Sequence, residues 1–552
     1  MAEFTRRALL AAPATMSLAA TAPSDRMAEA VERHDEAVPR YLKLQTIDPD
    51  SRWHGAPADA YGLHHGSSCG SFLEVLVTAF TQPKSRFHRD RDVLERIRLG
   101  AAALARMQTA GGNFNLLTTN YNSPPDTAFV LRSAVSAYRH AREAGEREIL
   151  RWLEPTLLKG GSGLVHGGMH TPNHRWVACA ALAQLNEVLP NPDYVRRIDQ
   201  WLAEAIDIDA DGQYAERSTL VYNHITNSAL IAMAEKLKRP ELLVPVRRNL
   251  EAMLYLLHPG DEVVTEISRR QDKYQRGKPQ SAWFALRYMA RQENDGRFAT
   301  LESRLNPSLS QLMEYPLLRQ PGPAPLPLPD DYARLAPSGS FAHIRRGETS
   351  VTMMMSGDSR FLTMRRGGAV VEAVRMAWAF FGKGQLVPQR GGRSGEAWLW
   401  EQDLDAGYWQ PFDTPRVVPP GVDSWYKLRA ERKRTEVCQM RYQAVGEETA
   451  KGFRLRLRAG GTADVPVAVE LHLCDGGKLE GCSPAPAAPP DAFVLTKGYA
   501  TFTVGGDSIR FGPGLREHGY TQLRGALPKL PGPSVYLCGY APFDHTVEFE
   551  LR

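Results

Sequence analysis

The chain has 552 residues, a formal net charge of +5, 43% hydrophobic residues and 23% charged residues. This length exceeds what one hydrophobic core serves, so we expect two large domains of ordinary globular composition. The small net charge excludes the basic footprint of a dedicated nucleic-acid-binding protein. No apolar run beyond the N-terminal region approaches the roughly 18 residues of a membrane span, so we expect no membrane-spanning segment.

Residues 1–24 follow the pattern of an export signal. Arg6 and Arg7 precede the apolar run 8–12, and small residues continue to Ala22. A charged start, a short apolar run and a small-residue exit predict export, and the paired arginines indicate the twin-arginine route. We therefore expect a periplasmic or secreted protein; the alternative is an Ala-rich tail without a signal.

Residues 25–316 are predicted to form a helical domain, because apolar residues recur at intervals of three and four. Ser123 before Pro124, and Thr171 before Pro172, are typical helix starts. The expected helices cover about 26–46, 69–82, 91–109, 125–143, 146–158, 172–188, 193–207, 218–237, 240–258, 280–292 and 297–314. Their short connections favour antiparallel hairpins in a bundle, a solenoid or a toroid, and the lack of a fixed repeat argues against a regular solenoid.

A Pro-rich linker, residues 317–337, separates this half from residues 338–552, where apolar residues alternate with a period of two. Alternation of this kind, interrupted by glycine turns, predicts antiparallel sheets and a β-sandwich. Cys474 and Cys482 bracket a turn-rich segment, and in an exported chain they are candidates for a disulfide.

The first candidate site is the helix start around Asn173. With Thr171 as the capping residue, Asn173 and His174 lie in the first helical turn and Trp176 follows. Free backbone N–H groups and the positive end of the helix dipole favour an anion there, and a histidine exchanges a proton near neutral pH. A capped helix with an exposed polar turn is the alternative.

The second candidate is the segment from Asp211 to His224. An Asp-Gly turn leads to a helix that would carry Tyr222 and His224 in its first two turns. A tyrosine acts as an acid or a base once nearby positive charge lowers its pKa. The residues that enter this hypothesis are Tyr214, Glu216, Tyr222, His224, Arg269 and Arg270. A core aromatic at Tyr222 and a charged surface loop around Arg270 are the alternatives.

Two further groups are candidates for substrate binding. His64 and His65 form a glycine-flanked pair before a helix, and Asn120 and Asn122 precede the helix start at Ser123. The histidines could line a pocket, whereas a metal site is disfavoured because no acidic residues flank them. Loop asparagines are also common turn formers.

Together these segments resemble the heparinase II/III and alginate-lyase superfamily of polysaccharide lyases. The resemblance rests on the Asn173-His174 pair at a helix start and on the Asp-Gly-x-x-x-Glu-x-Ser turn, Asp211 to Ser218, that leads to Tyr222. In the family the tyrosine stands three residues after the serine, whereas Tyr222 stands four after Ser218. The resemblance implies an incomplete (α/α) toroid followed by an antiparallel β-sandwich.

The resemblance also implies β-elimination at a 4-linked uronic acid. Asn173 would neutralise the substrate carboxylate, a base among His174, His224 and Tyr222 would take the C5 proton, and a tyrosine would protonate the leaving O4. The expected partner is an acidic polysaccharide, and no cofactor or metal is required. Rival hypotheses are a uronate C5-epimerase, a glycoside hydrolase with the same toroid, which needs two opposed carboxylates, and a non-catalytic carbohydrate-binding protein.

Overall fold

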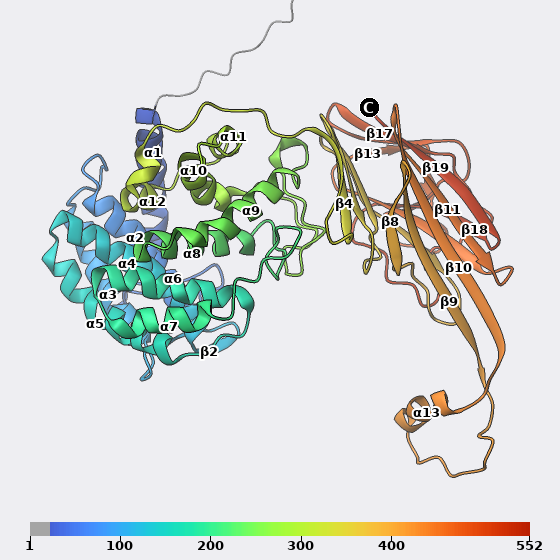
Figure 1. Cartoon of the computed structure of the whole chain (residues 1–552), viewed down its shortest axis with the longest axis horizontal. Coiled ribbons are helices and arrows are strands. Elements are labelled where there is room, and N and C mark those ends of the chain that lie inside the picture. Colours follow the sequence, from blue (N-terminus) through green and yellow to red (C-terminus); the bar gives the residue numbers. More distant parts are fainter. Residues whose placement is uncertain (1–22) are drawn as a thin grey trace, which may run out of the picture. The chain divides into compact units, whose positions relative to one another are not determined.

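The computed structural model describes residues 23–552. Helices come first in the described chain and antiparallel strands follow (Figure 1). The fold class predicted from the sequence, an incomplete (α/α) toroid followed by an antiparallel β-sandwich, is confirmed. The export signal predicted for residues 1–24 lies, as far as residue 22, outside the described residues. None of the described helices is both long and apolar enough to cross a bilayer.

The chain forms two compact units whose boundary differs from the predicted one. The first unit comprises the chain up to Ala203, Lys236–Lys238 and Ala282–Pro327. The second comprises Glu204–Glu235, Arg239–Ser281 and Leu328–Arg552. Most of residues 204–281, which we expected in the helical domain 25–316, therefore belong to the same compact unit as the strands.

Helix hairpins build the first unit. Three helices that are buried on most sides each pair with the amphipathic helix that follows in sequence, which gives an inner and an outer layer. The pairs are α2 (Gly66–Thr81) with α3 (Arg91–Met107), α4 (Pro124–Ala144) with α5 (Arg147–His166), and α6 (Pro172–Val188) with α7 (Pro192–Leu202). The remaining elements are α1 (Pro23–Leu44), α10 (Trp283–Gln292), α11 (Gly296–Ser303), α12 (Leu309–Glu314) and the hairpin of β1 (Phe114–Leu116) and β2 (Asn120–Ser123).

The helix expected over 297–314 is divided into α11 and α12. Pro307 lacks the N–H that a continuous helix needs, and the chain restarts at Ser308, whose side chain accepts from the backbone N–H of Gln311. The first part of the predicted linker is also docked on helices: the Arg291 guanidinium donates to the Gln320 carbonyl, and Leu326 donates its N–H to Gly296.

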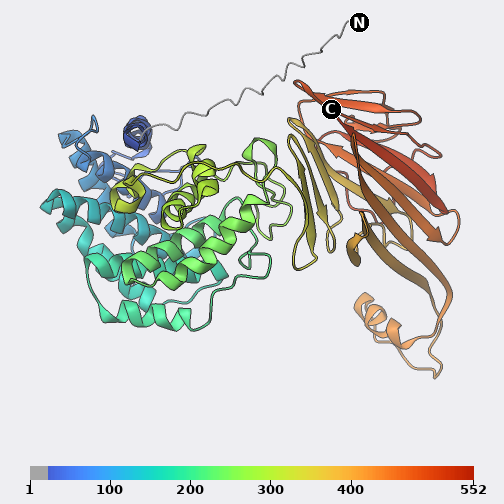
Figure 2. The ribbon, with the colours of Figure 1, turned by 45° about the horizontal axis from the view of Figure 1, so that its top comes forward.

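Two sheets form the sandwich of the second unit (Figure 2). One has nine strands in the order β14-β15-β18-β12-β7-β6-β5-β4-β3, and the other has eight in the order β13-β16-β17-β19-β11-β10-β9-β8. In the nine-stranded sheet the strands are β3 (Asp331–Leu335), β4 (Phe341–Arg346), β5 (Thr349–Met354), β6 (Leu362–Arg366), β7 (Ala369–Trp378), β12 (Pro466–Leu473), β14 (Ser483–Pro484), β15 (Ala492–Val494) and β18 (Ser534–Tyr540). In the eight-stranded sheet they are β8 (Arg390–Ser394), β9 (Ala397–Trp409), β10 (Arg434–Thr449), β11 (Gly452–Gly461), β13 (Lys478–Glu480), β16 (Ala500–Val504), β17 (Asp507–Gly512) and β19 (Phe543–Leu551).

The core of the sandwich lies between the two sheets. The inward positions of β11 and β12, which the alternating pattern predicted, are fully buried, and Trp378 of β7 stacks on Tyr442 of β10. Cys474 is buried in the same core and directs its Sγ toward the Gly368 carbonyl, 3.7 Å away. The disulfide considered between Cys474 and Cys482 is therefore not formed, and the six cysteines of the described residues are free thiols.

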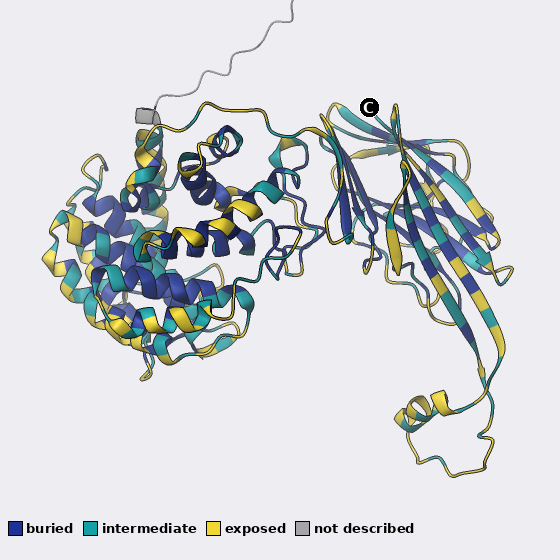
Figure 3. Ribbon diagram, viewed as in Figure 1, coloured by how far each residue is buried: buried dark blue, intermediate teal, exposed yellow. Residues whose placement is uncertain are grey.

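Several central strands of the nine-stranded sheet are buried on both faces (Figure 3). The segment that follows α8 (Tyr222–Leu237) and α9 (Leu243–Leu254) covers part of its outer face: Leu256, Val264 and Ile267 pack against Phe341 and its neighbours. The backbone of this covering segment is largely irregular after α9, so its polar groups need partners from the sheet.

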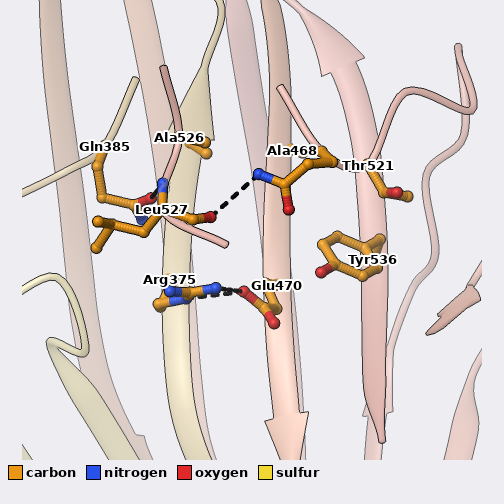
Figure 4. Close-up of a pocket in the computed structure, with 10 residues that line it drawn as sticks. Arg375, Gln385, Ala468, Glu470, Thr521, Ala526, Leu527 and Tyr536 are labelled. Atoms are coloured by element: carbon orange, nitrogen blue, oxygen red, sulfur yellow. Dashed lines mark hydrogen bonds and ion pairs between the residues drawn. The ribbon is translucent and has the colours of Figure 1, made fainter. Parts of the chain in front are cut away.

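A buried ion pair crosses the same sheet. Arg375 of β7 donates to Glu470 of β12, and the two residues are 4% and 5% exposed (Figure 4). Glu470 also accepts from the Ser534 hydroxyl at 2.9 Å. The adjoining pocket has a volume of about 10 Å³, which is space for a single water molecule. The pair is therefore structural.

Removing one member of this pair is expected to destabilise the second unit strongly. Glu470→Ala leaves the buried Arg375 guanidinium without its counter-charge, which costs about 3–5 kcal/mol. The double variant Arg375→Met/Glu470→Leu removes both charges and should recover most of that loss. Urea unfolding followed by tryptophan fluorescence measures both; equal losses in the single and the double variant would contradict this account.

Candidate functional site

The turn that precedes α8 is built by aspartates. Asp209 Oδ1 accepts from the backbone N–H groups of Asp211 and Gln213 at 2.9 and 3.0 Å. Gly212 has φ +73°, and a Cβ there would lie 2.8 Å from the Arg248 carbonyl oxygen, so only glycine fits. This is the Asp-Gly turn that the sequence predicted.

Arg217 links this turn to the sheet. Its guanidinium donates to Asp209 at 2.9 and 3.1 Å and is paired with Asp211. Asp211 accepts in turn from the backbone N–H and the hydroxyl of Ser338, at 2.8 and 2.6 Å. The start of the candidate segment is therefore held on residues just before β4.

Asp272 connects the start of α8 to the loop that carries Arg270. It is 1% exposed, and its carboxylate accepts from the hydroxyls of Ser218 at 2.9 Å and Ser268 at 2.5 Å. Ser218 also accepts from the backbone N–H of Tyr222 at 2.9 Å. The first turn of α8 and the loop 268–272 are thus joined at one buried carboxylate.

Tyr222 lies beneath Arg270. The guanidinium carbon is 4.6 Å from the ring centroid and Nη2 is 3.5 Å from the phenol oxygen. The Gln271 amide donates to the same oxygen at 2.5 Å. A guanidinium and a neutral amide donor therefore both face the Tyr222 oxygen.

Glu216 pairs with Arg270 at 3.3 Å. It is 7% exposed, and its Oε2 has no hydrogen-bond partner among the described residues. Burial raises the pKa of Glu216, partly offset by Arg270. The carboxylate therefore orients the guanidinium through this pair.

The other two candidates of this segment, Tyr214 and His224, are buried. Tyr214 is 3% exposed, donates its hydroxyl to Asn227 at 2.7 Å, and burial raises its pKa well above 10. His224 is 2% exposed, and burial lowers its pKa to about 4. Neither side chain can reach a substrate in this conformation, so neither enters the proposed mechanism.

In the first unit, Asn173 offers an unused donor. It is 3% exposed, and its Oδ1 accepts from the Thr171 hydroxyl at 2.7 Å. Its Nδ2 has no partner among residues 23–552. Because the Thr171 hydroxyl donates to Asn173, it does not cap the backbone N–H groups at the start of α6. The His174 ring lies edge-on to His170, with centroids 4.8 Å apart. A buried N–H donor at an uncapped helix start fits a carboxylate.

The remaining candidates serve local structure. His65 precedes α2 and lies between Asp59, at 3.2 Å, and the backbone N–H of Leu117, while His64 stacks on Trp53. Asn120 donates to Asp126 at 2.9 Å, and Asn122 has φ +46° and accepts from Thr109. Trp176 is fully buried, and Arg269 is exposed and donates to the Ala215 carbonyl. The described residues contain no cluster of His, Cys, Asp and Glu that could hold a metal ion.

Gln271 and Asp272 are the site residues that the sequence did not single out. Both belong to a charge-rich loop, and their partners lie about fifty positions earlier in the chain. The only signal was the density of hydrogen-bonding side chains around Arg270.

Three solved polysaccharide lyases have a fold similar to that of this chain. Chondroitin AC lyase of Streptomyces coelicolor has a TM-score of 0.53 at 14% identity, over 98% of this chain and 80% of that one. Xanthan lyase of Paenibacillus has a TM-score of 0.56 at 10% identity, over 96% and 58%. Heparan sulfate lyase HepC of Pedobacter heparinus has a TM-score of 0.50 at 10% identity, over 94% and 83%. No family model and no curated protein sequence matches this chain. At these identities the likeness establishes the fold.

Acid is expected to destabilise the protein below neutral pH. Burial lowers the pKa of His140, His224, His258 and His472 to about 4. For His224, the unfolded chain takes up its proton near 6.5 and the folded protein only near 4. Stability therefore falls as the pH drops through this window, by up to about 1.4 kcal/mol per pH unit for each such group.

His224→Gln removes one of these protons and should flatten the decline of unfolding free energy between pH 6.5 and 4.5. Urea midpoints at four pH values in this range measure the slope. His166→Gln, at an exposed position at the end of α5, is the control and should keep the wild-type slope. An unchanged slope in His224→Gln would show that the imidazole is already charged in the folded protein.

Proposed function

We propose that the protein is a polysaccharide lyase that cleaves an acidic polysaccharide at a 4-linked uronic acid by β-elimination. The observation that carries the proposal is the Tyr222 phenol, which is held between the Arg270 guanidinium and the Gln271 amide. The fold likeness to lyases of three acidic polysaccharides supports the same reaction class. A glucuronate-containing bacterial or plant gum is the substrate we favour, and a periplasmic or secreted location stays a prediction.

The first requirement of this reaction is to neutralise the uronate carboxylate, because the C5 carbanion is stabilised through that group. A neutral amide donor meets this need without taking a proton from solvent. We assign this role to Asn173, whose Nδ2 is buried and unpartnered in the described chain. One such donor contributes about 2.7–4 kcal/mol to transition-state stabilisation in comparable oxyanion sites.

The second requirement is proton transfer. The Tyr222 oxygen, as a phenolate stabilised by Arg270, takes the C5 proton, and the resulting phenol gives a proton to the leaving O4. The C4–O4 bond breaks as the C4–C5 double bond forms, so the product carries an unsaturated uronate. His174 stays the alternative base.

A hydrolytic mechanism fits the structure less well, because it needs two opposed carboxylates. Glu266 is 3% exposed; burial acts to raise its pKa, but His258, whose Nε2 lies 3.8 Å from Oε1, lowers it to about 2. Glu216 is paired with Arg270. Neither is available as an acid and a base across a glycosidic bond.

Tyr222→Phe should abolish proton transfer and lower kcat by about 10²–10⁴-fold. The assay follows the ultraviolet absorbance of unsaturated ends on a panel of uronate polysaccharides, including xanthan, alginate and chondroitin. Tyr540→Phe, at the end of β18 and 40% exposed, is the matched control and should retain wild-type turnover.

Two outcomes would change the assignment. Loss of activity in Tyr214→Phe, with retention in Tyr222→Phe, would make Tyr214 the catalytic tyrosine. New reducing ends without absorbance would indicate a hydrolase, and incorporation of solvent deuterium at C5 without chain cleavage would indicate a C5-epimerase.

Asn173→Ala should lower kcat by about 10²–10³-fold, with a smaller change in KM, since the lost donor acts mainly on the charge that develops in the transition state. Asn173→Asp should be worse still, because a second carboxylate repels the substrate. Asn186→Ala, near the other end of α6, is the control. Equal activity of Asn173→Ala and Asn186→Ala would remove Asn173 from the mechanism.

A further inference from the structure

Residues 410–433 form an extension between β9 and β10, here named the tip segment. It contains the short helix α13 (Val422–Leu428) and the turn Arg429–Glu431, and it projects from the end of the long β9–β10 hairpin (Figure 1). Strand pairing stops at Trp409 and Arg434. The prolines at 411, 415, 419 and 420 lack the N–H that a strand ladder needs, which explains why the chain leaves the hairpin here.

The tip segment buries none of its own residues (Figure 3). It nevertheless carries Phe412, Trp425 and Tyr426, and the last two are 42% and 57% exposed. Val417 and Val422 are 92% and 71% exposed. Apolar and aromatic side chains gathered on an exposed projection mark an interaction surface rather than a contribution to the fold.

Arginines are stacked on these rings. The Arg432 guanidinium lies 3.9 Å from the centroid of Phe412 and 4.4 Å from that of Trp425, and Arg416 lies 3.8 Å from Phe412. Arg429 lies 5.2 Å from Tyr426. Stacking fixes the plane of a guanidinium and leaves N–H groups at its edge for a carboxylate or a sulfate.

The charge of this region is strongly biased. Residues 410–434 contain six basic residues and three acidic ones, a net charge of +3 out of +5 for the whole chain. Two of the cations are used locally, since Arg416 pairs with Glu431 and Arg434 with Asp405. Lys427, Arg429, Arg432 and Lys433 form no ion pair within the described chain. Only Asp413 and Asp423 remain to offset these four cations, so the segment keeps a positive charge.

We propose that the tip segment binds an anionic polysaccharide chain, with its arginine edges on the carboxylates or sulfates and its exposed rings against the sugar faces. Trp, Tyr and Arg are the residue types that dominate binding energy at interfaces. The choice of polyanion rests on the proposed function. Binding itself does not require turnover, so the two proposals are tested by separate measurements.

Affinity electrophoresis of the full chain in native gels tests this proposal, with alginate, chondroitin sulfate or neutral dextran cast into the gel at 150 mM salt. Wild type should be retarded by the two anionic polymers and not by dextran. Arg429→Gln/Arg432→Gln/Lys433→Gln should raise the apparent Kd at least tenfold. The matched control is Arg454→Gln/Arg456→Gln/Arg458→Gln, which removes three exposed cations of β11 that already have acidic partners. It should bind like wild type.

A second variant keeps the test decisive if the charge variant changes the fold. Replacement of 410–433 by Asn-Gly closes the β9–β10 hairpin on the Trp409–Arg434 pair and, because the tip segment buries nothing, should leave the unfolding temperature unchanged while binding is lost. Wild-type retardation in either tip variant would overturn the proposal. Equal retardation by duplex DNA would reassign the surface to polyanions in general, and a dimer lost only in the tip variants would reassign it to a second copy of the chain. Retardation without turnover of any polymer would contradict the proposed function alone.

Discussion

The candidate site of the second unit depends on how residues 255–276 lie on the outer face of the nine-stranded sheet. This segment is irregular, and its buried polar groups must find partners in the sheet. Arg365 pairs with Glu262 at 2.6 Å, and Arg345 donates to the Leu257 carbonyl at 2.9 Å. His258 lies 2.9 Å from the Ser350 hydroxyl. Because these contacts come from β4, β5 and β6 together, the loop that carries Arg270 is held by a rigid surface rather than by its own sequence.

The buried titratable groups near this loop differ in how burial shifts their pKa. Burial keeps His258 neutral, whereas Glu266 beside it stays ionised, so one negative charge lies below the loop. Glu216 has the opposite tendency, since burial favours its neutral form. The Arg270 guanidinium is oriented by its pair with Glu216.

The sequence predicted helices and strands better than it predicted which segments contact one another in the fold. Helix starts at Ser123 and Thr171 were readable because capping and proline act locally, and the strands of 465–473 were readable because alternation reports a buried face. The sequence could not predict that most of residues 204–281 belong to the same compact unit as the strands. That grouping depends on contacts such as the one between Asp211 and Ser338, 127 positions apart. Burial of Trp176 was equally hidden, because α6 is covered on most sides and has no polar face to mark what is exposed.

Arginine stacked on an aromatic ring occurs both at Tyr222 and in the tip segment, and the surroundings give the two arrangements different physics. At Tyr222 the cation is partly screened from water and its effect falls on one oxygen atom. In the tip segment the guanidinium groups are solvated, and salt weakens attraction to a polyanion over a Debye length of about 8 Å at physiological ionic strength. Proton transfer at Tyr222 should therefore respond little to salt, whereas capture of a charged chain at the tip should weaken steeply. If the tip segment captures the substrate and Tyr222 transfers the proton, KM should rise with salt while kcat stays constant. A parallel fall in kcat would instead place the salt-sensitive charges at the site of proton transfer.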